Sequence, residues 1–240
     1  MIQAILFDLF ETLVTEGMRQ DGQSPTVAQR LGVDEQAFRT EWRKRQEKRM
    51  TGGFPDYASA LTDTCAELNC GTDHSLIGQL ESERIARFAR LFADPDPGIM
   101  NALREIGQLD VKVGIVSNAS ADEIAAWRDC QLSKVTDIAV FSCEVGCMKP
   151  DQAIYLIACE RLGVAPQECM YVGDGGFGEL PAAAELGMIT YCATWFRDRW
   201  PEDRPYPALT SPSGLVGAVR KAMERRQRPD RPGGAASCAT

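Results

Sequence analysis

Four polar residues in this 240-residue chain stand beside short apolar runs, where a buried strand would end or a helix would begin. They are Asp8 after Ala4–Phe7, Ser117 after Val111–Val116, Lys149 before the helical pattern Asp151–Leu162, and Asp174 after Met170–Val172. A carboxylate can attack carbon or phosphorus and form a covalent ester. A hydroxyl and an ammonium can hold an anionic group, and paired carboxylates suit Mg²⁺. The four side chains therefore predict one reactive site, if the fold brings them together.

The apolar runs are continuous rather than alternating, which is typical of strands buried on both faces of a parallel sheet. The predicted strands are Ala4–Phe7, Val111–Val116, Ile138–Phe141, Met170–Val172 and Ile189–Cys192. Helical patterns lie between the later strands, over Asp122–Cys130, Asp151–Leu162 and Leu180–Leu186. We therefore predict an α/β fold, a doubly wound parallel sheet with a Rossmann-type core. Ligands of such sheets bind beyond the carboxyl ends of the strands, where the four polar residues are expected to meet.

About eighty residues, rich in charge and with a helical period, separate the first predicted strand from the second. They contain the predicted helices Asp34–Met50, Tyr57–Leu68 and Ser75–Phe92. The proline- and glycine-rich stretch Asp94–Gly98 ends this helical run. We therefore expect a core over 1–15 and 94–224, an inserted helical cap over 16–93, and a polar, Pro/Gly-rich, disordered tail over 225–240.

The composition excludes several classes of protein. Lys plus Arg number 26 and Asp plus Glu 34, a net charge of −8 that argues against a general nucleic-acid binder. The single histidine, His74, leaves almost no room for a His-rich metal site or a Ser–His–Asp enzyme, and we expect it at the surface. No signal peptide or membrane span is visible, and nine cysteines without a C-x-x-C pair indicate reduced thiols in a cytoplasmic protein.

Structural interpretations compete with the functional ones. An aspartate after a strand most often caps a helix or forms a turn, and Lys-Pro is usually a turn. The segment Gly173–Gly178 also fits the dinucleotide-binding pattern G-x-G-x-x-G. Against that interpretation, Asp174 would point an anion at an anionic ligand, and the segment lies in the last third of the chain. The joint occurrence of four polar positions in order favours one shared reactive site over either alternative.

These residues and their neighbours resemble the four motifs of the haloacid dehalogenase superfamily, over residues 1 to about 192. The matching segments are FDLFETL with Asp8 and Thr12, VSNAS with Ser117, GCMKPD with Lys149, and YVGDGGFGEL with Asp174 and Glu179. The helical insert after the first strand is similar to the mobile helical cap of this superfamily.

The resemblance implies a role for each motif residue. Asp8 would be the nucleophile, and in the phosphatases of the superfamily its ester is an aspartyl phosphate. Ser117 and Lys149 would hold the transferring group and balance its charge. The implied Mg²⁺ site comprises the positions of Asp8, Phe10, Asp174 and Glu179, with Glu179 five residues after Asp174.

Phe10 departs from the phosphatase pattern. Phosphatases of the superfamily usually carry a second Asp two residues after the nucleophile, as general acid and base, and an aromatic ring cannot transfer a proton. L-2-haloacid dehalogenases carry Tyr there, because a halide leaves without protonation. This chain is also similar to them in the pairs Trp42-Arg43, Ser117-Asn118 and Lys149 with Tyr155. The fourth motif differs, since the dehalogenases need no metal and have Ser and Asn where this chain has Gly-Asp-Gly.

The sequence thus combines a dehalogenase-like first motif and cap with a phosphatase-like fourth motif. We predict a Mg²⁺-dependent phosphatase that acts on a small anionic substrate, as a monomer or homodimer with no nucleic-acid or membrane partner. The alternatives are a metal-independent 2-haloacid dehalogenase and a catalytically weak member that binds a metabolite or a protein. The residues expected to contact substrate are Thr12, Phe10, Asn118, Trp42, Arg43 and Tyr155.

Overall fold

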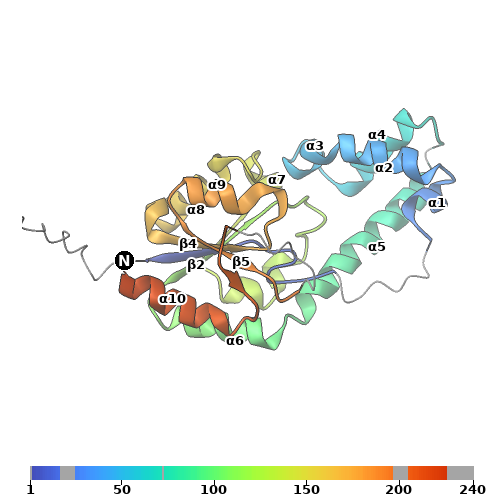
Figure 1. The fold of residues 1–240 in the computed structure, drawn as a ribbon. Coiled ribbons are helices and arrows are strands. Elements are labelled where there is room, and N and C mark those ends of the chain that lie inside the picture. The colour runs from blue at the N-terminus through green and yellow to red at the C-terminus, as the bar shows by residue number, and fades with distance from the viewer. Residues whose placement is uncertain (1, 17–24, 72, 197–204, 226–240) are drawn as a thin grey trace, which may run out of the picture.

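Figure 1 shows the computed structural model of the chain, which describes residues 2–16, 25–71, 73–196 and 205–225. Six parallel strands form one sheet in the order β3-β2-β1-β4-β5-β6. They are β1 (Ala4–Phe7), β2 (Lys112–Ser117), β3 (Ile138–Phe141), β4 (Cys169–Gly173), β5 (Ile189–Ala193) and β6 (Ala208–Leu209). The predicted α/β fold is confirmed. β6 has no counterpart among the predicted strands, because two residues are too few to produce a pattern.

The strand register brings the predicted site residues to one edge of the sheet. β1 lies between β2 and β4, and Phe7 is paired with both Ile115 and Val172. All three strands run in the same direction. Asp8, Ser117 and Asp174 therefore leave the sheet at the same edge, one or two residues beyond these pairs.

Helices cover both faces of the sheet (Figure 1). Figure 1 shows α8 (Gln152–Leu162) and α9 (Glu179–Glu185) on one face, and α6 (Pro97–Gly107) and α10 (Gly214–Arg225) on the other. Alternate residues of a strand point to opposite faces, so the fully buried segment Ala4–Phe7 contributes to two apolar clusters. This double burial explains why the strand is a continuous apolar run.

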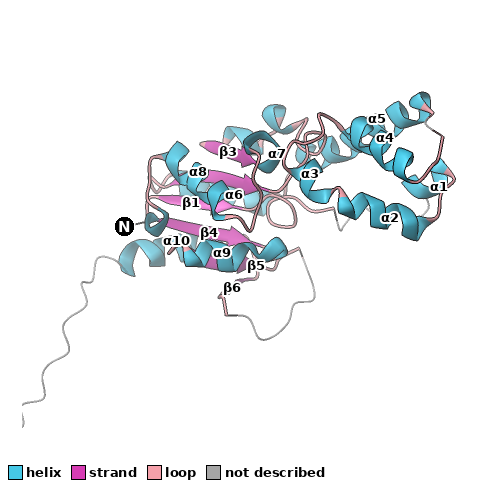
Figure 2. Ribbon diagram, turned by 90° about the horizontal axis from the view of Figure 1, so that it is seen from above, coloured by secondary structure: helices cyan, strands magenta, loops and turns pink. Residues whose placement is uncertain are grey.

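A helical segment lies beyond the carboxyl edge of the sheet (Figures 1 and 2). Its helices are α1 (Val27–Leu31), α2 (Glu35–Lys44), α3 (Gln46–Met50), α4 (Tyr57–Glu67) and α5 (His74–Ala93). They pack around a third apolar cluster, which includes Phe38, Tyr57 and Leu61. The last turns of α5, with Phe88 and Phe92, join the cluster of the sheet instead. The boundaries between core and cap remain a prediction.

Two predicted helices differ from the structure. The helix expected over 34–50 is broken at Arg45, whose guanidinium binds Glu41 and Asp63 and whose backbone leaves the helical region. The helix expected over 122–130 is wrong. Turns and one 3-10 helix, Trp127–Asp129, replace it, and a second 3-10 helix, Leu132–Lys134, follows.

Tertiary contacts accompany the second difference. Asp122 and Glu123 both pair with Arg84 of α5, and tertiary contacts override a helical propensity that is weak by itself. Among the remaining elements, α1, α6, α7 (Ser142–Val145) and α10 have no counterpart among the predicted helices. His74 is exposed, as predicted. Within the described ranges, no helix is both long and apolar enough to cross a membrane. The predicted tail lies, from residue 226 onward, outside the described residues.

The packing around Gly114 in β2 provides a test of the sheet core. An added Cβ would lie 2.7 Å from Leu6 Cδ2 and 3.1 Å from Ile138 Cγ1. We expect Gly114→Ala to lower the free energy of unfolding by about 1–3 kcal/mol, because a close-packed core cannot accommodate the methyl group. Gly217→Ala is the control, since nothing lies within 4 Å of its Cβ and a helical alanine should stabilise α10. Urea denaturation measures both, and a Gly114→Ala protein as stable as the wild type would contradict this packing.

Candidate active site

Asp8 is held in place by contacts to both oxygens of its carboxylate. Its main-chain N–H donates to the Val172 carbonyl of β4 at 2.9 Å, which fixes the residue at the end of the strand. Thr12 Oγ1 donates to Asp8 Oδ2 at 3.1 Å, and Lys149 Nζ donates to Asp8 Oδ1 at 2.5 Å. The indole N–H of Trp195 donates to the Thr12 carbonyl at 2.8 Å. The nucleophile predicted from the sequence is therefore oriented by residues far apart in the chain.

Lys149 is buried at the centre of the site. Its Nζ donates to Asp8 Oδ1, to Glu179 Oε2 at 2.6 Å and to the Tyr171 hydroxyl at 3.2 Å, so each of its three N–H groups has a partner. The Asn118 side chain binds the main-chain N–H and carbonyl of Lys149, at 2.7 and 2.9 Å. Burial alone would lower the pKa of Lys149, but the two carboxylates outweigh it and raise the pKa. The side chain is therefore a cation.

Glu179 is the first residue of α9, and both of its carboxylate oxygens have protein partners. Oε2 accepts from Lys149 and, at 2.7 Å, from the Tyr171 hydroxyl. Oε1 accepts from the main-chain N–H of Gly175 at 2.9 Å. The Tyr155 hydroxyl donates to the Glu179 carbonyl at 3.0 Å. Tyr155 is fully buried in this position, where it supports Glu179 and is closed to solvent.

The absence of a side chain at Gly173 makes room for the Glu179 carboxylate. A Cβ on Gly173 would lie 2.1 Å from Glu179 Oε1, closer than atoms can approach. The next glycine, Gly175, has a φ of 90°, which side chains rarely allow, and this turn points its N–H at the same oxygen. The two glycines of the Gly-Asp-Gly segment therefore allow Glu179, rather than a side chain of the loop, to bind Lys149.

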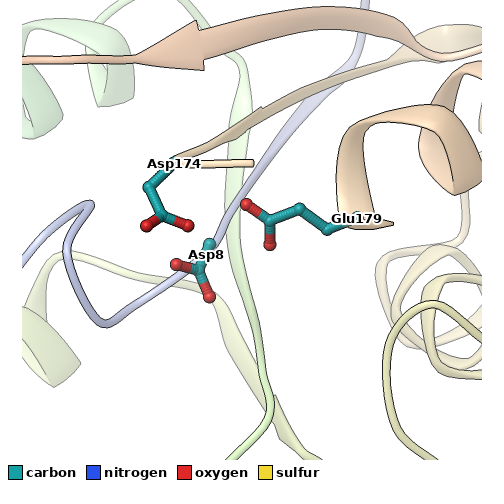
Figure 3. A group of neighbouring side chains, drawn as sticks. All are labelled: Asp8, Asp174 and Glu179. Carbon is teal, nitrogen blue, oxygen red and sulfur yellow. The ribbon is translucent and has the colours of Figure 1, made fainter. Parts of the chain in front are cut away.

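Asp8, Asp174 and Glu179 form a buried group of carboxylates (Figure 3). One oxygen from each lies within 4.8 Å of the others. Three carboxylates and one ammonium, that of Lys149, give this group a formal charge of 1 − 3 = −2. Burial raises the pKa of Asp8 to about 7 although Lys149 opposes the effect, and the nearby Glu179 contributes to the rise. An all-oxygen donor set with this charge fits a hard divalent cation such as Mg²⁺.

Ser117 lies at the end of β2 with a fully buried side chain. Its Oγ has no hydrogen-bond partner among the described residues. A buried hydroxyl without a partner is costly, and a site for a bound group explains why it is kept. Asn118, by contrast, uses its amide on the main chain of Lys149. Asn118 therefore fixes the backbone of Lys149 and, through it, the position of the ammonium.

Phe10 packs against α5. Its ring centroid lies 5.6 Å from that of Phe88, in an edge-to-face arrangement, and 6.4 Å from that of Phe92. The side chain offers no oxygen to a cation and no proton to a leaving group. Of the four positions expected around a metal, three therefore supply carboxylates.

Trp42 and Arg43, neighbours in sequence, have different surroundings. Trp42 stacks on Phe38 at 5.8 Å and meets the edge of Tyr57 at 5.3 Å, so its ring is part of the apolar cluster of the helical segment. Arg43 is exposed and lines a cleft of about 570 Å³ together with Lys149 and others. Of the expected pair, only Arg43 borders a space shared with a site residue.

Tyr171 is a site residue that the motif analysis does not find. It is fully buried in β4 and contacts both Lys149 and Glu179 through its hydroxyl. The available signal is a polar-tipped aromatic residue in an otherwise apolar strand. A hydroxyl of that kind needs a partner when it is buried, but the sequence does not show which one.

Replacing Tyr171 by phenylalanine tests this arrangement. Tyr171→Phe removes a hydroxyl that donates to one charged group and accepts from another, so we expect the free energy of unfolding to fall by about 1–3 kcal/mol. Tyr155→Phe is the comparison, because its hydroxyl donates to the main-chain carbonyl of Glu179 rather than to a charged group. We expect a smaller loss of about 1 kcal/mol in this variant. Urea denaturation compares the two, and a larger loss for Tyr155→Phe would contradict the assignment.

Comparison with known proteins agrees with this geometry. The model of the haloacid dehalogenase-like hydrolase family matches residues 2–187. The (S)-2-haloacid dehalogenase 4A of Burkholderia cepacia is 27% identical over 199 residues, 79% of this chain and 81% of that protein. The glyceraldehyde 3-phosphate phosphatase of Methanopyrus kandleri is 26% identical over 237 residues, 92% and 98% of the two chains.

A similar solved structure shows the same fold. The 2-haloacid dehalogenase of Pseudomonas syringae pv. Tomato DC3000 has a TM-score of 0.64 at 20% identity, and the match covers 92% of this chain and all of that one (100%). Dehalogenases and phosphatases thus both occur among the similar proteins. With the sheet topology and the family match together, the chain belongs to the haloacid dehalogenase-like hydrolases.

Proposed function

We propose that this protein is a Mg²⁺-dependent phosphatase that uses Asp8 on a small anionic substrate. The main support is the buried group of three carboxylates with a single ammonium, because its negative charge favours a divalent cation. A metal-independent displacement at carbon gives no reason for Asp174 to join this group. The similar phosphatase of Methanopyrus kandleri adds support from outside the chain.

In the first step, an oxygen of Asp8 attacks phosphorus and the bond from phosphorus to the leaving oxygen breaks. The electron pair of that bond stays with the leaving group, and an aspartyl phosphate forms. Lys149 and the free hydroxyl of Ser117 stabilise the negative charge of the transferring group. Thr12 keeps the carboxylate oriented for the attack.

In the second step, water attacks the phosphorus and the bond to Asp8 breaks. Inorganic phosphate leaves, the proton lost by the water passes to solvent, and the Asp8 carboxylate is restored. Asp8 and Asp174 would hold Mg²⁺, while Glu179 remains bound to Lys149, Tyr171 and the loop. When bound, the ion supplies positive charge for the oxygens of the phosphoryl group.

A second candidate is a 2-haloacid dehalogenase, in which Asp8 attacks carbon and displaces a halide. The observation that favours it is Phe10, since a halide needs no proton from the enzyme. Both candidates use Asp8. A screen of aryl phosphates, acyl phosphates and 2-chloropropionate, with and without Mg²⁺, separates them from each other and from a member that binds without turnover.

The first functional test asks whether phosphatase activity requires Asp8 and Mg²⁺. We expect Asp8→Asn to lower phosphatase kcat/KM by at least about 10³-fold, because an amide cannot act as the nucleophile. Excess chelator should remove the wild-type activity, and Asp174→Ala should raise the Mg²⁺ concentration needed for half-maximal rate.

Asp34→Asn is the control in these assays, since Asp34 caps α2 far along the chain from the site and asparagine caps equally well. Circular dichroism checks the fold of each variant. Full phosphatase activity in Asp8→Asn would exclude the covalent mechanism. Full activity on 2-chloropropionate in excess chelator would instead favour the dehalogenase.

The absence of a side-chain acid at Phe10 predicts a dependence on the leaving group. General acid catalysis contributes about 10²–10⁴-fold, and its loss affects mainly leaving groups that are strong bases. We therefore expect wild-type rates to rise steeply as the pKa of the leaving group falls, so that acyl and aryl phosphates react faster than sugar phosphates.

Phe10→Asp should make this dependence shallower. A series of aryl and alkyl phosphates, assayed on both proteins, measures the two slopes. If chemistry limits the rate and the wild-type rate is still insensitive to the leaving group, another residue supplies the proton. Glu11 is the nearest candidate by sequence.

A further inference from the structure

Besides Ser117 Oγ, two buried polar atoms have no hydrogen-bond partner within the described part of the chain, and they lie where the helical segment meets the sheet. Arg49 of α3 and Ser120 of the loop after β2 are 7% and 5% exposed. Arg49 Nε and Ser120 Oγ make no hydrogen bond within the described part of the chain. Both residues line the same small cavity, of about 10 Å³. Charged and polar groups are rarely buried without partners, so this pair needs an explanation.

Arg49 remains a cation without a carboxylate of its own. Its guanidinium stacks on the Trp42 ring at 3.9 Å, and its NH2 group donates only to the Trp42 carbonyl, at 3.3 Å. Burial, followed by the nearby Arg84, lowers the pKa of Arg49 to about 10, which still leaves it charged at neutral pH. Stacking on an aromatic ring orients the planar group but leaves its Nε–H free to bind an anion.

The acids near Arg49 are engaged elsewhere. Arg84 Nε pairs with Asp122 at 2.5 Å, and Arg84 NH2 pairs with Glu123 at 2.6 Å. Asp56 and Asp122 both line the cavity, and Asp56 caps α4 by accepting from the N–H of Ser59. These interactions give Asp122 and Glu123 a cation other than Arg49. The Nε of Arg49 and the hydroxyl of Ser120 are thereby left for a ligand.

The cavity lies close to the proposed reaction site. Ser120 follows Ser117 by three residues, and three residues of extended chain span at most about 11 Å. Ser117 stands at the same sheet edge as Asp8. Figures 1 and 2 show α3 beside α7, at the end of the helical segment nearest the sheet. The two serines are therefore close enough for a single small molecule to be long enough to reach both.

We propose that Arg49 and Ser120 bind a second anionic group of the substrate, a carboxylate or a phosphate, at the end remote from Asp8. The cavity has room for about one water-sized atom, so it accepts one oxygen of that group. Arg49 Nε and Ser120 Oγ both donate to this oxygen. The inference rests on the proposed phosphatase function and narrows its substrate to a short phosphate ester that carries another acidic group.

The test compares three non-hydrolysable ligands of equal chain length by isothermal titration calorimetry in Mg²⁺. n-Propylphosphonate has one anionic group, 3-phosphonopropionate adds a carboxylate, and propane-1,3-bisphosphonate adds a second phosphonate. We expect at least one of the two-headed ligands to bind the wild type about 10- to 100-fold more tightly than n-propylphosphonate, as hydrogen bonds to a charged group predict. Which one gains more identifies the second group.

Three variants test which residues cause the tighter binding of the two-headed ligands. Ser120→Ala should reduce the gain and Arg49→Gln should abolish it, whereas Arg39→Gln should leave it unchanged. Arg39 is the matched control, because it is exposed on α2 and pairs with Glu35. Ser120→Ala removes only a hydroxyl, so it keeps the test valid if Arg49→Gln fails to fold.

Two outcomes would overturn the inference. If the three ligands bind the wild type equally, the cavity holds a bridging water only. If the gain is the same in Ser120→Ala and Arg49→Gln as in the wild type, the second group binds elsewhere. The proposed function fails separately: binding of none of the three phosphonates would exclude both proposals, whereas binding of n-propylphosphonate without any gain excludes only the second anionic group.

Discussion

One buried ammonium among three buried carboxylates is the constraint on which the rest of the site depends. Lys149 comes from the loop before α8, Asp8 from the end of β1 and Glu179 from the start of α9, so the ion pairs connect three elements. Removing one partner of a buried pair leaves a charge without compensation, at a cost of about 3–5 kcal/mol. The elements that carry these residues are therefore held in one arrangement, and Tyr171 and the Asn118 amide complete the hydrogen bonds.

The charge of this group connects the fold to hydrolysis. A parallel sheet places the polar residues that follow its strands at one edge. The helices that cover its two faces exclude water from the interior. Burial raises the pKa of Asp8, with a contribution from Glu179, and the excess of carboxylates over the one ammonium makes the group suitable for a divalent cation. In the proposed function, the Asp8 carboxylate is the nucleophile, and the Lys149 ammonium and the buried Ser117 hydroxyl would bind the anionic group that reacts.

The helical segment contributes in a different way. Its own cluster around Phe38 and Tyr57 needs no contact with the sheet, whereas α5 belongs to both parts and brings Phe88 against Phe10. Ion pairs from Arg84 to Asp122 and Glu123 fasten this segment to the loop that follows Ser117. The sheet edge thus carries the residues of the four motifs, whereas in the proposed function the residues that face it from the helical segment would contact the rest of the substrate.

The sequence by itself determined five of the six strands, the edge at which they end, and the positions of Asp8, Ser117, Lys149 and Asp174 at or near that edge. Buried parallel strands and the polar residues that follow them leave a local pattern in the sequence. Only the tertiary structure decided which residues these side chains, and others that the motifs do not include, contact. Tyr171 binds Glu179, Trp42 packs inside the helical segment, and the predicted helix over 122–130 gives way to turns whose acids bind an arginine of α5. Local patterns record burial and propensity, whereas the partner of a buried charge is set by residues that are distant in the chain and adjacent only after folding.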